Sequence, residues 1–168
     1  VNDNTVSVEL RDGSKYEGRL IIGADGANSV VSKELNINPG WPDKNVLWAI
    51  GEDIQISKER IDEFFGRKRM LRICLGYKGT GYAWVFPKRE HINLGLGGGV
   101  ASAKNVKELY ENWIDDLKSK NLIPQEVNSK RVRATNVPAG EAFRLRTYSN
   151  RTLLVGDAGG FVSAVSGE

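Results

Sequence analysis

The chain has 168 residues, of which 40% are hydrophobic and 27% charged, and its formal net charge is +3. This composition is typical of a folded globular protein and excludes the disordered, collagen-like and coiled-coil classes. No apolar run approaches the roughly 18 residues that span a bilayer, and the basic residues are too scattered to support nucleic-acid binding.

The N-terminal part predicts a hairpin, a strand and a short helix. Apolar and polar residues alternate over 6–10, the period of a half-buried strand, and Asp12-Gly13 is a strong hairpin-turn signal. We expect the return strand over 15–24, with its continuously apolar second half covered on both faces. A helix over 29–35 follows, and then a loop over 36–43 that is a candidate crossing between domains.

The middle of the chain predicts a mostly antiparallel sheet with helices. Ser57 favours an N-cap for a helix that ends near residue 65. Apolar residues recur at helical spacing over 104–120, and Asn105 with Glu108 resembles a capping box at its start. The expected strands are 46–56, 70–76, 81–86, 91–97 and 130–137.

The C-terminal part predicts an extended segment over 143–147 and a short strand over 151–155. That strand leads into Gly156-Asp157-Ala158-Gly159-Gly160-Phe161, where we expect a helix to begin. Glycines let a backbone approach a ligand closely, and N–H groups at a helix start favour negative charge. An ordinary tight turn between a strand and a helix has the same residue types, so both interpretations stay open here.

A similar turn occurs near the N-terminus, at Gly23-Ala24-Asp25-Gly26-Ala27-Asn28-Ser29. Here too Asp25 could simply end the strand, and Ser29 or Asn28 could simply cap the helix. Together the two turns are more specific, because they flank a segment with a different pattern. We expect the two strands to belong to one sheet and the turns to meet at its carboxyl ends, where α/β folds bind ligands.

The two turns resemble motifs of flavoproteins of the p-hydroxybenzoate hydroxylase type. Asp25-Gly26-Ala27-Asn28-Ser29 matches the D-G-x-x-S-x-x-R motif, and Gly156-Asp157-Ala158 matches the later G-D motif. The resemblance implies that Asp157 contacts the ribityl chain of FAD and that Asp25-Gly26 lies near the pyrophosphate. Ser32 stands where the first motif has Arg, which weakens NADPH recognition. Gly160 stands where aromatic hydroxylases usually have His.

A third motif resembles that of geranylgeranyl reductases. The family has Y-x-W-x-F-P followed, after seven or eight residues, by G-x-G, and the motif lines its prenyl-substrate tunnel. Its matching positions, which the resemblance implies are substrate-binding, are Tyr82, Trp84, Phe86, Pro87, Gly95 and Gly97. Residues 156–168 also resemble that family's G-D-A-A-G-F-V-x-P-x-T-G-E, with Gly159 and Ala164 as departures.

From the residues alone, the three aromatics fall on one face of a strand by its period of two. They could form the wall of a cavity for a long apolar ligand, or pack the core against the helix over 104–120. His91 and Cys74 are a single histidine and a single cysteine, so the sequence predicts no zinc site and no Ser–His–Asp triad. We expect no catalytic residue to be identifiable in this chain.

The resemblance implies an α+β chain with the p-hydroxybenzoate hydroxylase-like fold, in which a mostly antiparallel sheet with helices on one side is inserted into an α/β FAD domain. We expect residues 1–40 and 149–168 to be parts of the FAD-binding domain and 41–148 to be the substrate domain. FAD-binding residues are expected at Asp25, Gly26, Gly156, Asp157, Ala158, Gly159, Gly160 and Phe161.

The implied function is an FAD-dependent oxidoreductase that reduces prenyl-chain double bonds. The implied partners are a prenyl lipid or other apolar substrate and an electron donor, NADPH or ferredoxin. The alternatives are another flavoprotein (hydroxylase, halogenase or electron-transferring dehydrogenase) and a non-catalytic lipid- or partner-binding domain. We expect a cytoplasmic protein, or one peripheral at a membrane. Because no G-x-G-x-x-G turn occurs in residues 1–168, we expect the chain by itself to hold FAD weakly or not at all and to be inactive.

Overall fold

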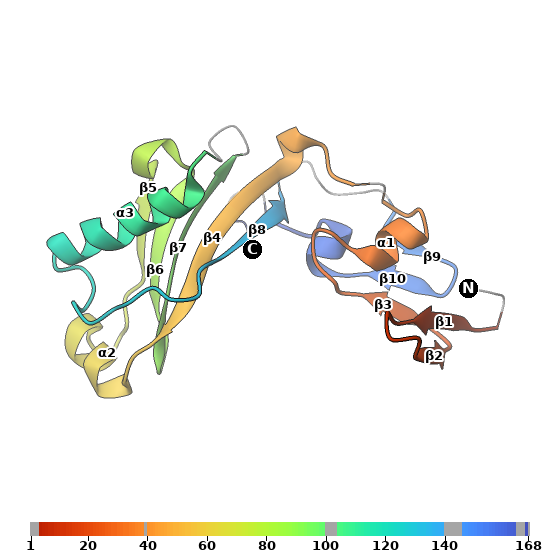
Figure 1. Cartoon of the computed structure of the whole chain (residues 1–168), viewed down its shortest axis with the longest axis horizontal. Helices are drawn as coiled ribbons and strands as arrows, with labels where there is room; N and C mark the ends of the chain where they lie inside the picture. The colour runs from red at the N-terminus through yellow and green to blue at the C-terminus, as the bar shows by residue number, and fades with distance from the viewer. Residues whose placement is uncertain (1–3, 39, 100–103, 140–145, 164–166, 168) are drawn as a thin grey trace. The chain divides into compact units, whose positions relative to one another are not determined.

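The computed structural model describes residues 4–38, 40–99, 104–139, 146–163 and 167. The chain divides into two compact units (Figure 1). The first unit comprises Val1–Val46 and Asn136–Glu168, and the second comprises Leu47–Thr135. The division falls at the start of strand β4 (Val46–Gln55) and within strand β8 (Arg133–Pro138), whereas the predicted domains were 1–40, 41–148 and 149–168.

The first unit contains two small sheets. Strands β1 (Val6–Glu9) and β2 (Lys15–Gly18) form the predicted antiparallel hairpin. Strand β3 (Ile21–Gly23) pairs in parallel with β10 (Thr152–Leu154), and β9 (Tyr148–Ser149) pairs antiparallel with β10.

The expected continuous return strand over 15–24 is wrong, because β2 ends at Gly18 and β3 begins at Ile21 in a different sheet. The expected burial of its apolar half on both faces is also wrong, since Ile22 is 56% exposed. The opposite side of this sheet is the covered one, because Val31 lies close to Gly23 there and Leu154 is buried. Val31 belongs to the short helix α1 (Val30–Glu34), which lies where the sequence predicted a helix.

The second unit is a five-stranded sheet with helices, and it shows the predicted antiparallel meander. The strand order is β5-β6-β7-β4-β8, and the pairs β5–β6, β6–β7 and β4–β7 are antiparallel. The bounds are β4 (Val46–Gln55), β5 (Arg72–Leu75), β6 (Tyr82–Pro87), β7 (His91–Gly99) and β8 (Arg133–Pro138). Short 3-10 helices lie at Asp43–Asn45, Tyr77–Gly79 and Gly156–Gly159.

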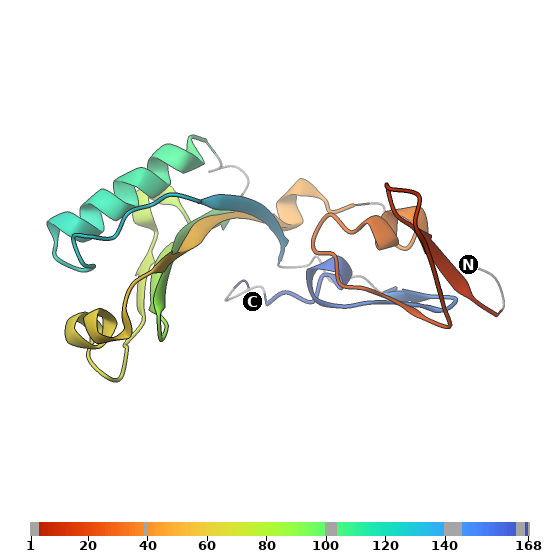
Figure 2. The ribbon, with the colours of Figure 1, turned by 60° about the horizontal axis from the view of Figure 1, so that its bottom comes forward.

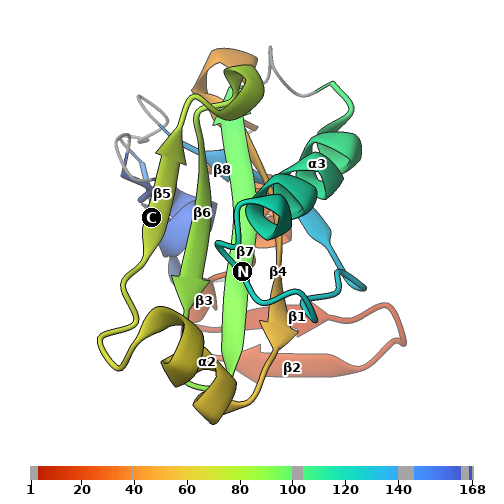
Figure 3. The same cartoon turned by 90° about the vertical axis from the view of Figure 1, so that its left-hand side faces the viewer.

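Helix α3 (Val106–Ser119) lies along one face of this sheet, and α2 (Lys58–Phe65) lies near one end of it (Figures 2 and 3). The apolar positions of α3 recur at helical spacing and are buried at Tyr110, Trp113, Ile114 and Leu117. Ser57 caps α2 as predicted, through a bond from the Arg60 N–H. The capping box at Asn105 is wrong, because Asn105 has a left-handed backbone and its side chain makes no cap.

The core of the second unit lies between α3 and the sheet. Its sheet side comes from alternate residues of three neighbouring strands, which are Trp48, Ile50, Ile54, Ala83, Val85, Ile92, Leu94 and Leu96. We call this side of the sheet the covered face. Helices therefore lie on one side of a mostly antiparallel sheet, as predicted. Most of the predicted extended segment over 143–147 lies outside the described residues.

Candidate functional site

The two Asp-Gly turns meet, as the sequence predicted. They follow β3 and β10, which are parallel neighbours with Gly23 opposite Leu154, and the Val155 N–H donates to the Gly23 carbonyl. Residues of both turns, among them Ala27, Ser29 and Ala158, line a hollow of about 10 Å³. A hollow of this size holds about one water molecule, so the described residues bring the turns together without enclosing a cofactor-sized cavity.

In the first turn, the Asp25 side chain is bonded to the helix that follows it. The Asp25 carboxylate accepts hydrogen bonds from the N–H groups of Val30 (2.7 Å) and Val31 (3.2 Å) at the start of α1. Burial acts to raise the pKa of Asp25, but bonds from the Ser29 hydroxyl and these N–H groups outweigh it, so the pKa lies below its ordinary value. Asp25 therefore has a structural role as a helix cap.

Two neighbours of Asp25 fix the geometry of this turn. Gly26 has a φ of +78°, which a residue with a side chain rarely adopts. Ser32 stands at the position where the motif has Arg. It is buried, and its backbone N–H donates to the Ser29 hydroxyl oxygen. A buried serine cannot present a charge to a ligand.

The second turn is a single 3-10 turn over Gly156–Gly159, where the sequence predicted that a helix begins. Gly156 and Gly160 have positive φ values of +54° and +73°. The N–H groups of Gly160 and Phe161 donate to the backbone carbonyls of Asp157 and Gly156. Gly159 packs against the Phe161 ring, which leaves no room for a Cβ.

Asp157 differs from Asp25 in its surroundings. It is half-buried, and no described residue bonds to its carboxylate. It follows the carboxyl end of β10, where backbone N–H groups and polar side chains in α/β folds meet ligands. Of the two predicted carboxylates, Asp157 is therefore the one that is available to a ligand.

The aromatic residues of β6 lie on the face of the sheet opposite α3. Tyr82, Trp84 and Phe86 are half-buried, whereas Ala83 and Val85 between them are fully buried in the core. The alternative that the aromatics pack against the helix over 104–120 is therefore wrong. Adjacent ring centroids lie 5.4 Å apart for Tyr82–Trp84 and 6.1 Å for Trp84–Phe86, so the three rings form a continuous row.

Glycines on the two neighbouring strands lie beside this row. Gly97 pairs with Tyr82, and Gly95 pairs with Trp84. The Trp84 ring lies over Gly95, because a Cβ there would be 2.2 Å from Trp84 Cζ2. Gly51 follows on β4, opposite Gly95. Because Gly95 has no side chain, the Trp84 indole can lie on the backbone of the neighbouring strand.

Pro87 does not join the other predicted substrate residues. It is buried, pairs with Ile92, and alternates onto the covered face with Val85. Two residues of β5 that the sequence did not suggest lie beside the aromatic row. Ile73 pairs with Trp84, and Leu75 pairs with Tyr82. We call the side of the sheet that carries these residues the open face: Ile73, Leu75, Tyr82, Trp84, Phe86, Gly51, Gly95 and Gly97.

A polar relay across three strands holds Trp84. Its indole N–H donates to Asn93 Oδ1 at 2.6 Å, and Asn93 Nδ2 donates to Asp53 Oδ1 at 2.8 Å. His91 Nε2 lies 3.6 Å from the same Asp53 oxygen. Asn93 lies inside the seven-residue spacer of the third motif, where the family pattern specifies no residue. Only strand pairing could have identified it.

Other site types find no support among the described residues. No group of three His, Cys, Asp or Glu side chains there could hold a metal ion. Cys74 is half-buried on the covered side of β5 and packs against the core. No helix in the described segments is long and apolar enough to cross a membrane. Ala164, one of the departures from the family string, lies outside those segments.

Comparison with known proteins confirms the resemblance to geranylgeranyl reductases. The chain is 32% identical over 153 residues to the chloroplastic geranylgeranyl diphosphate reductase of Oryza sativa subsp. japonica, covering 91% of this chain and 31% of the relative. It is 36% identical over 158 residues to digeranylgeranylglycerophospholipid reductase 2 of Methanosphaera stadtmanae, covering 89% and 36%. The chain thus spans about a third of the curated relatives it matches. No protein-family model matches it.

Solved structures confirm the p-hydroxybenzoate hydroxylase-like fold. A geranylgeranyl bacteriochlorophyll reductase-like protein from Thermoplasma acidophilum superposes with a TM-score of 0.68 at 17% identity, over 100% of this chain and 42% of that one. A halogenase crystallised with phloroglucinol and FAD gives a TM-score of 0.64 at 14% identity, over 99% and 37%. Such low identities establish the fold alone.

Proposed function

We propose, from the relationship to geranylgeranyl reductases, that this chain is part of an FAD-dependent reductase that hydrogenates double bonds of a prenyl chain. The observation that carries the proposal is the open face of the second unit. It carries a row of aromatic rings beside glycines, and it contains the positions that match the prenyl-binding motif except Pro87. The activity, substrate and electron donor of the whole protein are inferred from that surface and from the relatives.

The open face suits a long, flexible apolar ligand. Spacings of 5.4 and 6.1 Å between adjacent rings are comparable to the length of one extended isoprene unit, so successive units can contact successive rings. Each CH₂ group that leaves water contributes about 0.8 kcal/mol. A branched chain without hydrogen-bonding groups can draw its affinity from contact area alone, and the open face offers mainly that.

The second turn suits a polyhydroxylated cofactor chain, and we assign it to FAD. The Asp157 carboxylate is free of described partners and can accept hydrogen bonds from hydroxyl groups. Gly156 is exposed and has no side chain, so a ligand could approach its backbone closely. FAD, when bound, supplies the reducing chemistry. The described residues form only part of such a site, so the chain by itself should hold FAD weakly.

A matched pair of carboxylate variants tests the flavin assignment. In the FAD-loaded protein, Asp157→Asn should lower flavin content, measured by absorbance. Because bound FAD itself stabilises the fold, stability is compared without FAD, where Asp157→Asn should leave the melting temperature unchanged. Asp25→Asn should instead lower the melting temperature, because it weakens the cap of α1, which is worth about 0.5–2 kcal/mol. Wild-type flavin content and turnover in Asp157→Asn would show that Asp157 does not contact FAD.

Replacing Trp84 tests the substrate assignment. Trp84→Ala should fold, because the indole lies outside the core, and should bind a geranylgeranyl ligand several-fold more weakly. Affinity can be measured by calorimetry, with Trp41→Ala in the first unit as the matched tryptophan control. A folded Trp84→Ala protein with unchanged prenyl affinity would overturn the assignment.

The fold is shared with a halogenase, so a substrate comparison separates the alternatives. The proposal predicts consumption of reduced flavin with a geranylgeranyl substrate and none with phloroglucinol. The opposite preference would favour an aromatic-substrate flavoenzyme, and binding without turnover would favour a lipid-binding domain. NADPH and ferredoxin are the candidate electron donors. Peripheral association with a membrane follows from the prenyl-lipid substrate.

A further inference from the structure

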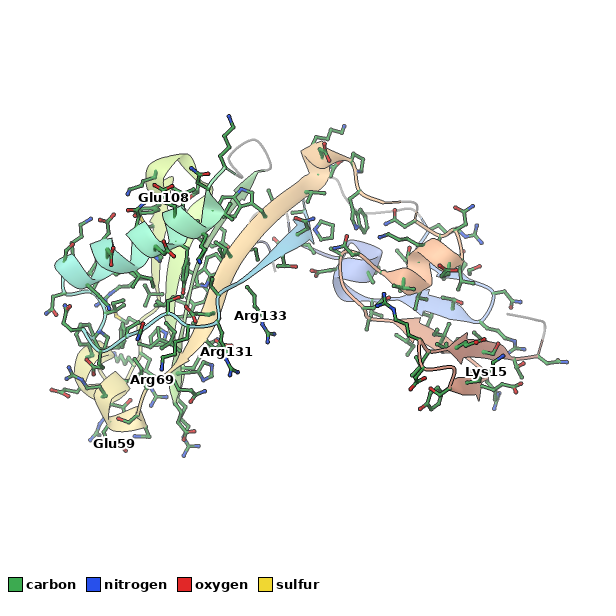
Figure 4. The ribbon with its side chains drawn as sticks, viewed as in Figure 1. Lys15, Glu59, Arg69, Glu108, Arg131 and Arg133 are labelled. Atoms are coloured by element: carbon green, nitrogen blue, oxygen red, sulfur yellow. The ribbon has the colours of Figure 1, made fainter. Side chains whose placement is uncertain are left out.

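A cavity lies between helix α3 and strand β5 of the second unit. Its volume is about 160 Å³, and its lining comes from these two elements and from Leu122, just beyond α3. Strand β5 is an edge strand of the five-stranded sheet. Figure 4 shows side chains of α3 and of the sheet in the layer between them. The cavity therefore lies at the margin of the core, on the side of the sheet away from the aromatic row.

The helix side of the cavity is a single stripe of α3. Trp113, Asp116, Leu117 and Lys120 line it, and residues three, four and seven positions apart lie on one side of a helix. Trp113 and Leu117 are buried, whereas Lys120 at the end of the helix is exposed. The stripe thus runs from the core to the surface, which gives a small molecule a way in.

The strand side of the cavity has little to fill the space. Cys74, the residue that β5 packs against the core, is smaller than the leucines and isoleucines of the strands further in. Arg72, two residues earlier, is directed elsewhere, because its guanidinium donates to the Leu122 carbonyl and lies 5.2 Å from the centroid of the Phe65 ring. A small residue and a long one that is already bound leave the cavity between them and α3.

One polar group of the lining has no partner. The Trp113 side chain is 6% exposed, and its indole N–H finds no acceptor in the part of the chain that the structure describes. The neighbouring carboxylate is engaged, since Asp116 Oδ2 accepts the Tyr77 hydroxyl at 2.7 Å. Buried donors in folded proteins are nearly always hydrogen-bonded. A buried free donor beside a cavity indicates an acceptor that comes from outside the described chain.

We propose that the cavity binds an apolar molecule the size of one aromatic ring, whose single hydrogen-bond acceptor bonds to the Trp113 indole N–H. An apolar cavity of about 150 Å³ can hold benzene, and this one has about 160 Å³. The acceptor should be neutral, such as a ketone or amide carbonyl, because Arg72 and Asp116 already have partners and a buried anion needs a free one. The inference does not depend on the proposed function.

The test compares a ligand that has an acceptor with one that lacks it. Titrate the FAD-loaded protein by calorimetry with acetophenone, which carries a carbonyl, and with ethylbenzene, a hydrocarbon of similar size. Cys74→Leu fills the cavity, and Cys74→Ser, the control at the same position, leaves its volume almost unchanged. Trp113→Phe removes the donor and keeps a ring.

An NMR measurement on the wild type reports on the site directly. With isotopically labelled tryptophan, each indole N–H gives its own signal. The Trp113 signal can be identified through its proximity to the Tyr77 ring, whose centroid lies 4.8 Å from that of Trp113.

Wild type and Cys74→Ser should bind acetophenone about threefold to tenfold more tightly than ethylbenzene, as one net hydrogen bond predicts, and acetophenone should shift the Trp113 signal. Cys74→Leu should bind neither ligand, and Trp113→Phe should bind both equally well. The proposal is overturned if the wild type binds neither ligand or does not distinguish them, if Cys74→Leu keeps full acetophenone affinity, or if Trp113→Phe keeps the preference. Where a variant does not fold, a Trp113 signal that acetophenone leaves unmoved overturns it equally.

Discussion

The two faces of the sheet in the second unit differ in what their residues do. On the covered face, Leu94 and Leu96 are fully buried against α3 and the rest of the core. On the open face, the same strand carries Gly95 and Gly97, and its neighbour β6 carries three aromatic rings. A face that only stabilised the fold would gain from larger side chains. Under the proposed function, the covered face holds the unit together and the open face receives the ligand.

The largest expected difference between the faces is in the stability lost when a leucine on each is replaced by alanine. Leu94→Ala should cost about 2–5 kcal/mol of unfolding free energy, because it empties a fully buried core position. Leu75→Ala should cost no more than about 0.5 kcal/mol, since Leu75 is 81% exposed. Urea denaturation measures both. Similar losses for the two variants would remove the distinction between the faces.

A methyl group at Gly95 tests whether Trp84 packs directly on this glycine. Its Cβ would lie 2.2 Å from Trp84 Cζ2 and 2.7 Å from the Ile50 carbonyl oxygen. Gly95→Ala should therefore cost about 1–3 kcal/mol and weaken prenyl binding. Gly99→Ala is the control, because a Cβ there meets nothing within 4 Å. Equal stability and affinity for the two variants would contradict the packing of Trp84 on Gly95.

The covered face should also show an acid dependence. Glu52 is on the covered face of β4, and its carboxylate accepts the N–H groups of Arg131 and Lys130 and the Tyr110 hydroxyl. The pKa of Glu52 is lowered in the folded state. Its stabilisation is therefore complete above the ordinary pKa of glutamate, near 4.5, and is lost as the pH falls through the lower folded value. Glu52→Gln should cost about 1–2 kcal/mol at pH 7 and less at pH 3, followed by denaturant titration. A pH-independent cost would contradict this role.

The smallest effect on stability is expected at the relay. Asn93→Leu removes the acceptor for the Trp84 indole N–H on the exposed side of the sheet, so its effect on unfolding should stay within roughly 0.5 kcal/mol. The freed ring should weaken prenyl binding several-fold and change the near-ultraviolet dichroism of the aromatic row. Asn128→Leu, at an exposed asparagine, serves as the control. A normal spectrum with normal affinity would show that the relay does not position Trp84.

The sequence predicted what depends on local periodicity. Spacing alone located α3, and alternation alone placed Tyr82, Trp84 and Phe86 on one face. It could not say which face α3 covers, because that depends on tertiary packing. The Trp84–Asn93 bond depends on strand pairing. Asp25 stayed ambiguous, because a helix cap and a ligand site use the same residue types.

The return strand shows a further limit of sequence reasoning. The apolar run at Leu20-Ile21-Ile22 predicted burial on both faces, whereas Leu20 is 52% exposed and Ile22 56% exposed. An apolar run shows that a segment can be buried. It does not show that another part of the chain covers that segment, because the covering residues can be distant in sequence.

Photo-crosslinking tests the central claim, that a prenyl chain lies on the open face, most directly. A geranylgeranyl diphosphate analogue with a diazirine on its chain would be irradiated with the FAD-loaded protein, and the adducts mapped by mass spectrometry. The account predicts adducts within 72–75 and 82–86, reduced by unlabelled geranylgeranyl diphosphate and by Gly95→Ala. Adducts concentrated on α3 or in the first unit, with none on β5 or β6, would contradict it.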